Sequence, residues 1–240
     1  MSASNSLSPK QPGASVQRLR SAPIHHAQTA HQFALTVVRR AILTGELAAG
    51  SRLFQEDIAD RLGLSTTPVR EALRELAHAG LVNFDPHRGA VVANVTGGEV
   101  VSIVEVRFAL EPLAVEMAIG SMSRDPIRRL DSLYLGMLGD PESPGWVDKS
   151  RRFQRTILNE ANRPRLAAIL MRLQDASLHY LEISRKQRPD VRTAVNDQLG
   201  ALLRAIRKHD PAGAAPAVQN QLSFLLELTH LEQPESRTAQ

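Results

Sequence analysis

Small hydroxyl side chains and arginines are concentrated in the sequence LSTTPVREALR, which begins at residue 64. Ser65 is a residue type that begins helices, because its hydroxyl can accept a backbone N–H of the first turn. Thr66 and Thr67 follow it, where exposed amides and the positive end of the helix dipole favour a phosphate. Arg70 and Arg74 lie one turn apart, on the side opposite an apolar face. A helix of this kind can enter the major groove of a duplex, where arginine hydrogen-bonds guanine.

The surrounding sequence predicts the elements that position this helix. Apolar periodicity predicts a helix from His31, and QEDIADRLG predicts a short second helix that ends at Gly63. The helix that begins at Ser65 should stop at Gly80. The β-prone runs LVNFD and AVVANV, separated by PHRG, then predict a hairpin. Three helices and a hairpin indicate a winged helix-turn-helix over residues 29–96.

The tip of the predicted hairpin carries a histidine, an arginine and a glycine. His87 and Arg88 could reach the adjacent minor groove or the phosphate backbone, and Gly89 permits a close turn. A simpler alternative is a solvated surface helix with a lattice of alternating charges. Residues 29–96 contain seven arginines and seven acidic residues, so charge does not decide between the two. DNA binding would depend on where the arginines lie, and not on a basic field over the whole domain.

Composition excludes several classes of protein. The 240 residues contain no cysteine, which excludes disulfides, thiolate metal sites and thiol chemistry. No apolar run approaches the roughly 18 residues that span a bilayer, and the N-terminus lacks the apolar core of a secretory signal. We therefore expect a cytoplasmic protein without a membrane partner. The net charge of +4, from 29 basic and 25 acidic residues, is compatible with nucleic acid as a partner.

The remainder of the chain predicts a second, purely helical domain over residues 97–232. The glycines of TGGE at 96–99 mark the boundary between the two domains. Six helices are expected, at about 98–122, 125–138, 145–162, 164–186, 190–209 and 211–231. Residues 1–28 and 233–240 are expected to be a disordered and a frayed tail. The predicted fold class is mainly α, with an N-terminal winged helix-turn-helix and a C-terminal all-α six-helix bundle.

The N-terminal domain resembles the DNA-binding domain of the GntR family of bacterial transcription regulators. The resemblance rests on AILTGELAAGSRLFQEDIADRLGLSTTPVREALRELAHAGLV, followed by HRGAVV, and covers roughly residues 34–95. It implies binding to operator DNA by paired winged helices. The positions implied to contact DNA are Ser65, Thr66, Thr67, Arg70, His87, Arg88 and Gly89.

Two positions depart from the family's pattern. Thr66 stands where the family often has arginine after the serine, and Glu56 stands where arginine is common on the preceding helix. Each difference removes an expected contact with phosphate or guanine, so the operator should differ from the usual half-sites. Arg52 is a candidate to compensate.

The C-terminal domain resembles the FCD effector domain of the FadR-like branch, in its VanR-type subgroup. VRFALEPLAVEMA fits the R-x-x-L-E opening helix with Arg107 and Glu111, an i, i+4 pair. Arg107 could anchor a ligand carboxylate, and the two residues must be paired if they are buried. Beside them runs an apolar stripe that consists of Ile103, Val106, Leu110, Leu113 and Met117.

The metal ligands that such domains often carry are absent. Alignment with the family places Ser150, Gln154, Leu199 and Gln221 where its aspartate and three histidines stand. Helical periodicity turns all four positions toward the bundle interior. We therefore expect no metal cofactor. Either the two glutamines and Arg107 bind a small polar ligand directly, or the domain has lost sensing and only dimerises.

The expected function is that of a homodimeric transcription regulator. Its partner would be double-stranded operator DNA, and a small organic-acid-like effector would shift the population of domain arrangements, most simply for a repressor. The alternatives are a dimeric regulator whose helical domain senses nothing, and a winged-helix adaptor that binds protein. We do not expect an enzyme, because no nucleophile elbow, phosphate-binding loop or zinc-protease motif is present.

Overall fold

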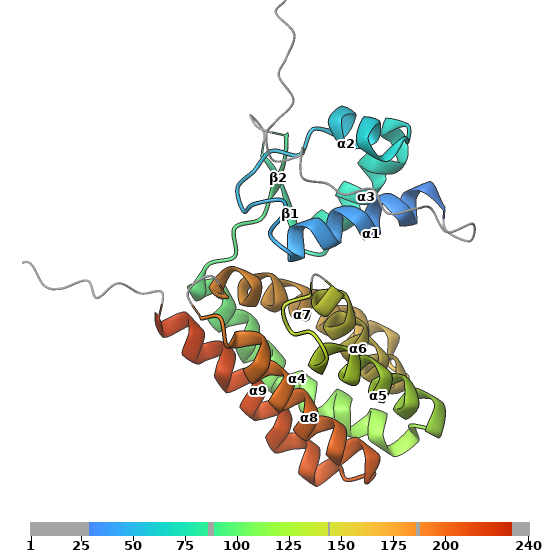
Figure 1. The fold of residues 1–240 in the computed structure, drawn as a ribbon, viewed down its shortest axis with the longest axis vertical. Helices are drawn as coiled ribbons and strands as arrows, with labels where there is room; N and C mark the ends of the chain where they lie inside the picture. The colour runs from blue at the N-terminus through green and yellow to red at the C-terminus, as the bar shows by residue number, and fades with distance from the viewer. Residues whose placement is uncertain (1–28, 86–88, 144, 186–187, 232–240) are drawn as a thin grey trace, which may run out of the picture.

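The computed structural model describes residues 29–85, 89–143, 145–185 and 188–231. The predicted tails at 1–28 and 233–240 lie outside these ranges. The chain forms a small N-terminal domain with a hairpin and a larger all-helical domain (Figure 1). The predicted fold class is confirmed. No helix in the described part of the chain is long and apolar enough to cross a membrane.

The N-terminal domain consists of three helices and two antiparallel strands. Their bounds are α1 Ala30–Leu43, α2 Gln55–Leu62, α3 Thr66–His78, β1 Val82–Asp85 and β2 Gly89–Val92. Gly63 ends α2 in the left-handed conformation, with φ of 64°, as its position in the sequence predicts. The strands pair Val82 with Val92 and Asp85 with Gly89. The wing-tip residues His87 and Arg88 lie outside the described residues.

The start of α3 differs from the prediction in one detail. Ser65 is the N-cap residue, with extended φ and ψ of −75° and 163°, but its hydroxyl makes no capping hydrogen bond. The predicted cap contact is therefore wrong. The helix is held instead by its apolar face, since Val69, Ala72, Leu73 and Leu76 are completely buried. Packing energy of an amphipathic face usually exceeds the contribution of a cap.

Six helices form the C-terminal domain. They are α4 Gly97–Ser121, α5 Arg124–Leu138, α6 Gly145–Glu160, α7 Pro164–Ser184, α8 Val191–Arg207 and α9 Pro211–Leu231. A capping box joins Thr96 and Glu99 at the start of α4, at the predicted domain boundary. Helix α4 packs against α9, α7 and α6, and α8 packs against α9 and α5 (Figure 1).

Helix α4 buries an ion pair among apolar residues and leaves other apolar residues exposed. Arg107 and Glu111 are each 2% exposed. In the apolar stripe beside them, Val106 and Leu113 are 44% and 45% exposed, whereas Leu110 and Met117 pack partly against the core. Exposed apolar residues that share one side of a helix usually mark a surface that binds another protein or a ligand.

The two domains meet where α1 lies over α6 and α7. Two ion pairs cross the contact, with 3.6 Å between Arg39 Nε and Asp175 Oδ2 and 3.6 Å between Arg40 Nε and Asp148 Oδ2. His179 of α7 is buried at the same junction, close to the backbone of Ile42 and Ala93. The two domains therefore share a contact that includes buried charge.

Candidate functional site

The N-terminal end of α3 is the most open part of the N-terminal domain's helical face. Ser65, Thr66 and Thr67 are exposed, as are Arg70 and Arg74 on the following two turns. The buried face of the same helix holds the end in place, so these five side chains project from a fixed support. The structure thus brings the predicted DNA-contacting residues of α3 together on one surface.

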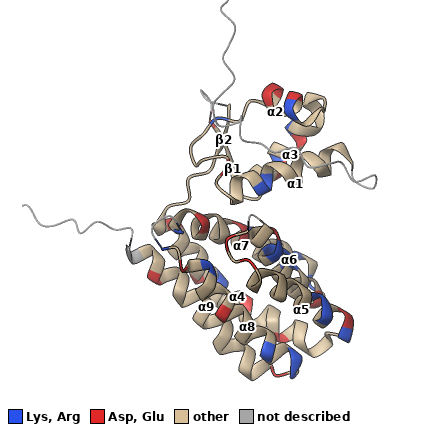
Figure 2. Cartoon of the chain, viewed as in Figure 1, with Lys and Arg blue, Asp and Glu red and all other residues tan. Residues whose placement is uncertain are grey.

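The arginines of this surface are available for a partner. Within the described residues, neither Arg70 nor Arg74 forms an ion pair, whereas Glu75 of the same helix contacts His31 and Arg39. The exposed charges of α3 are compatible with a solvated surface helix as well as with a DNA-contacting one. Figure 2 shows acidic and basic residues side by side on this domain, which therefore has no uniformly basic face in this view.

Two predicted contact residues lie on neighbouring elements. Arg52 is exposed and pairs through its backbone with Val91 of β2, which joins it to the base of the wing. Gly89 opens β2 with φ of 70°, in the region that favours glycine. The segment between Asp85 and Gly89 carries the tip residues that the structure does not describe.

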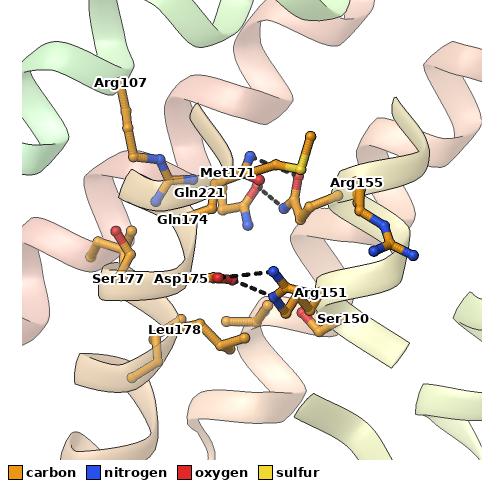
Figure 3. A pocket seen from close by; sticks show the side chains of 14 residues that line it. Arg107, Ser150, Arg151, Arg155, Met171, Gln174, Asp175, Ser177, Leu178 and Gln221 are labelled. Atoms are coloured by element: carbon orange, nitrogen blue, oxygen red, sulfur yellow. Dashed lines mark hydrogen bonds and ion pairs between the residues drawn. The ribbon is translucent and has the colours of Figure 1, made fainter. Parts of the chain in front are cut away.

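A second site lies inside the helical domain. A cavity of about 30 Å³, with an opening to solvent, is bounded by five helices (Figure 3). This volume holds one or two water molecules and not a metabolite. Its lining residues are Arg107, Ser150, Arg151, Gln154, Arg155, Met171, Gln174, Asp175, Ser177, Leu178, Leu181, Val195, Gln221 and Leu225.

A chain of hydrogen bonds runs along one side of the cavity. Arg107 donates to Glu111 through Nε at 2.7 Å and Nη2 at 3.2 Å. Gln174 Nε2 donates to Glu111 Oε1 at 2.9 Å and to Gln154 Oε1 at 3.3 Å. Gln154 Nε2 donates in turn to Gln221 Oε1 at 3.4 Å. The buried pair of α4 is therefore satisfied within the protein, together with the amides of α6, α7 and α9.

An ion pair forms the opposite side. Arg151 donates to Asp175 through Nε at 2.6 Å and Nη2 at 3.0 Å, a two-pronged contact with a carboxylate that is only 3% exposed as a residue. Arg155 lies one turn further along α6 and is exposed at the rim (Figure 3). No carboxylate of the described residues pairs with it. Burial and the neighbouring Arg151 and Arg152 lower the pKa of Arg155 below its usual value.

The sequence located this cavity in part. Arg107, Ser150, Gln154 and Gln221 line it, but Leu199 does not. Leu199 is completely buried among apolar side chains of the core, so its prediction as a pocket residue is wrong. Leu199 does point into the bundle, as predicted, but Val195, one turn earlier on α8, lines the cavity instead.

Five polar lining residues were not predicted from the sequence, namely Arg151, Arg155, Gln174, Asp175 and Ser177. A signal for Gln174 was present, because it continues the row of Leu170, Leu178 and Leu181 along α7. Asp175 carries no such signal, since a buried carboxylate can be recognised only from its arginine partners.

The side chains of this site do not suit a metal ion. No group of three or more histidine, aspartate or glutamate side chains in the described ranges is placed to hold one. The positions of the family's metal ligands carry a serine, two glutamines and a leucine. The glutamine oxygens accept hydrogen bonds from neighbouring amides, and arginines adjoin them. These side chains therefore do not fit the metal site of the family.

Comparisons with known families match both domains. Residues 32–92 match the model described as bacterial regulatory proteins, gntR family, and residues 102–224 match the FCD domain. The second match alone covers more than half of the 240 residues.

Curated proteins and solved structures include similar chains. An uncharacterized HTH-type transcriptional regulator of Mycobacterium tuberculosis is 29% identical over 134 residues, which are 56% of this chain and 55% of that protein. A Paenarthrobacter nicotinovorans protein named "Probable D-xylose utilization operon transcriptional repressor" is 42% identical over 77 residues, 32% of this chain and 34% of that protein. This chain therefore matches about half the length of the first relative and about a third of the second. The solved E. coli McbR/YncC has the same fold, with a TM-score of 0.70 at 21% identity, over 85% of this chain and 99% of that one.

Proposed function

This chain belongs to the FCD-domain, FadR-like branch of the GntR family of bacterial regulatory proteins, and we propose that it is a homodimeric transcription repressor that binds operator DNA. The observation that carries the proposal is the exposed end of α3. Three hydroxyl and two arginine side chains project there from a helix whose opposite face is apolar and buried. Neither arginine is paired within the described part of the chain. Such a surface is suited to phosphates at the helix end and guanine further along.

The proposed dimer is supported by the open side of α4. Val106 and Leu113 form an exposed apolar surface on the first helix of the bundle, together with the partly buried remainder of the stripe. A second copy would bury this surface against its own equivalent, as two-fold symmetry requires. Two winged helices would then be available for the two halves of an operator.

The cavity supports a small anionic effector without a metal. Its lining carries three arginines and one aspartate, which favours a carboxylate or phosphate group. At about 30 Å³ the cavity must widen before a metabolite can enter. An effector that binds a widened form would shift the population of domain arrangements away from the one that binds DNA. The alternative, a domain that only dimerises, is compatible with the hydrogen bonds that join the three glutamines.

Under this proposal the protein binds DNA in the bacterial cytoplasm and catalyses no reaction. An adaptor that binds protein through the same helix would lack the steep salt dependence of phosphate contacts. Measuring operator affinity at several salt concentrations therefore separates the two functions.

The direct test is Arg70→Ala in the full-length protein. An operator is first selected with the wild-type protein from a random-sequence duplex library, and affinities are then measured on it. We expect Arg70→Ala to weaken binding by about 1–3 kcal/mol, the typical contribution of an arginine to base discrimination. Its melting temperature should not fall, because Arg70 is exposed and unpaired in the structure.

The matched control is Arg204→Ala, which removes an exposed arginine from α8. This variant should bind the operator as the wild type does. Equal affinities for wild type and Arg70→Ala would show that α3 does not contact bases through Arg70, and the proposal would lose its main support.

A further inference from the structure

Asp175 connects the cavity to the N-terminal domain. The cavity side of its carboxylate is held by Arg151, at 2.6 and 3.0 Å. Arg39 of α1 contacts the same carboxylate, with 3.6 Å between its Nε and Asp175 Oδ2, the oxygen that Arg151 Nη2 also contacts. The two arginines thus share one buried carboxylate, and Arg151 has the closer contact.

Arg39 in turn reaches the DNA-binding helix. Its Nη2 lies 3.7 Å from Glu75 Oε1 on α3, and its buried Nε completes no hydrogen bond with a described residue. Burial, and next the charge of Arg151, lower the pKa of Arg39, against smaller opposing contributions from Asp175 and Glu75. Arg39 therefore lies between the carboxylates of Asp175 and Glu75. If the distance from Arg39 to one carboxylate shortens, its contact with the other weakens.

Arg151 and Arg155 both line the cavity, from successive turns of α6. They are four residues apart on α6, so their side chains are neighbours on one helix face. Arg155 is not paired with a carboxylate of the described ranges, and Arg151 has only Asp175. Arg155 is exposed and Arg151 is partly exposed, whereas Arg107 is buried and already pairs with Glu111.

We propose that Arg151 and Arg155 bind an anionic group of the effector, and that capture of Arg151 frees Asp175 to approach Arg39 more closely and draw it away from Glu75 on α3. The site would take a carboxylate- or phosphate-bearing metabolite. This inference rests on the proposed function, because it describes how the cavity acts on the DNA-binding helix. It assigns the anion to α6, whereas the sequence pointed to Arg107.

The relay is tested first without any ligand, by a double-mutant cycle on operator affinity. Arg151→Gln removes the competitor for Asp175 and imitates the captured state, so it should change operator affinity roughly fivefold or more, the lower range of allosteric couplings. In the Arg39→Gln background the same change should have no effect. Arg151→Lys, which keeps a charge near Asp175, should restore most of the wild-type affinity.

Arg40→Gln provides the matched control. Arg40 is the next residue of α1 and also forms a 3.6 Å ion pair across the domain contact, but with Asp148, which does not line the cavity. In this background Arg151→Gln should retain its full effect. Equal effects of Arg151→Gln in the wild-type and Arg39→Gln backgrounds would overturn the relay.

The anion site is tested by calorimetry on the full-length protein, with citrate and inorganic phosphate as probes. At least one probe should bind the wild type. Binding of citrate would indicate a carboxylate-bearing effector, and binding of phosphate would indicate a phosphate-bearing one. Its binding should be about tenfold weaker or more for Arg155→Gln and for Arg151→Gln, and unchanged for Arg40→Gln. Binding of neither probe, or unchanged binding by Arg155→Gln, would overturn the site.

The two failures are distinguishable. A wild-type protein that selects no operator contradicts the proposed function itself. A wild-type protein that binds its operator, but whose Arg39 and Arg151 variants act independently, contradicts only the relay.

Discussion

Helix α3 exposes its arginines, whereas helix α4 buries an arginine–glutamate pair and exposes apolar residues beside glutamates. Helix α3 buries apolar residues and exposes Arg70 and Arg74, as an ordinary surface helix does. Helix α4 buries Arg107 with Glu111 and leaves Val106 exposed. The open arginines of α3 suit a polyanion, whereas the open apolar side of α4 suits another apolar surface. The same chain thus contains one helix whose outer face suits nucleic acid and one whose outer face suits a second protein chain.

The largest expected effect breaks the α4 side of this comparison. Leu113→Asp puts a charge into the proposed dimer contact. Because a two-fold contact contains each residue twice, we expect dimerisation to weaken by about 3–6 kcal/mol, twice the value of one buried leucine. Sedimentation analysis over a range of concentrations measures the change.

Leu135→Asp is the control for this prediction. Leu135 of α5 is 63% exposed and lies outside the α4 stripe, so the variant should remain as dimeric as the wild type. If the wild type is a monomer, or if Leu113→Asp dimerises normally, the open side of α4 has another role.

The next effect concerns the buried side of α4. Arg107→Met leaves Glu111 buried without its cationic partner, which typically costs about 3–5 kcal/mol of unfolding free energy. Denaturation by urea measures the loss. Arg107→Met combined with Glu111→Leu removes both charges and should recover most of the stability. A loss below roughly 1 kcal/mol for the single variant would mean that the pair is not buried in solution.

The smallest effect tests the junction between the domains. Burial lowers the pKa of His179 below its ordinary 6.5, with smaller opposing contributions from the Ala93 and Ile42 backbone and from Glu182. Because the unfolded chain binds the proton more readily, the stability from neutral His179 is complete above pH 6.5 and is lost as the pH falls below it.

The expected slope from this histidine is at most about 1.4 kcal/mol per pH unit. His179→Leu should flatten the pH dependence of stability below pH 6.5, the ordinary value of this group. His78→Gln, at an exposed position of α3, should leave it unchanged. An identical pH dependence in His179→Leu would show that the imidazole reaches water in the native state.

The sequence predicted helix positions better than it predicted contacts. Apolar periodicity, prolines and glycines determine where a helix lies, and α9 spans the residues 211–231 that these signals indicate. Periodicity also gives the inward direction, and so Gln154 and Gln221 were found. It does not give the depth at which a side chain lies along a helix, which is why Leu199 was placed in the cavity and Val195 was not.

Residues whose environment comes from another helix could not be predicted in this way. Asp175 is buried only because Arg151 of α6 and Arg39 of α1 meet it there. The outward direction of the α4 stripe likewise depends on which side the other helices cover. Such features follow from tertiary packing and leave no periodic signal in one segment.

The central claim is that the exposed end of α3 touches a DNA duplex. The chain contains no cysteine, so Thr67→Cys introduces a single thiol at this end without competing sites. A photoactivatable cross-linker on this thiol should join the protein to its selected operator, whereas the same group on Ser223→Cys of α9, also exposed, should not. Cross-linking from position 223 and none from position 67, under conditions where the operator is bound, would contradict the account.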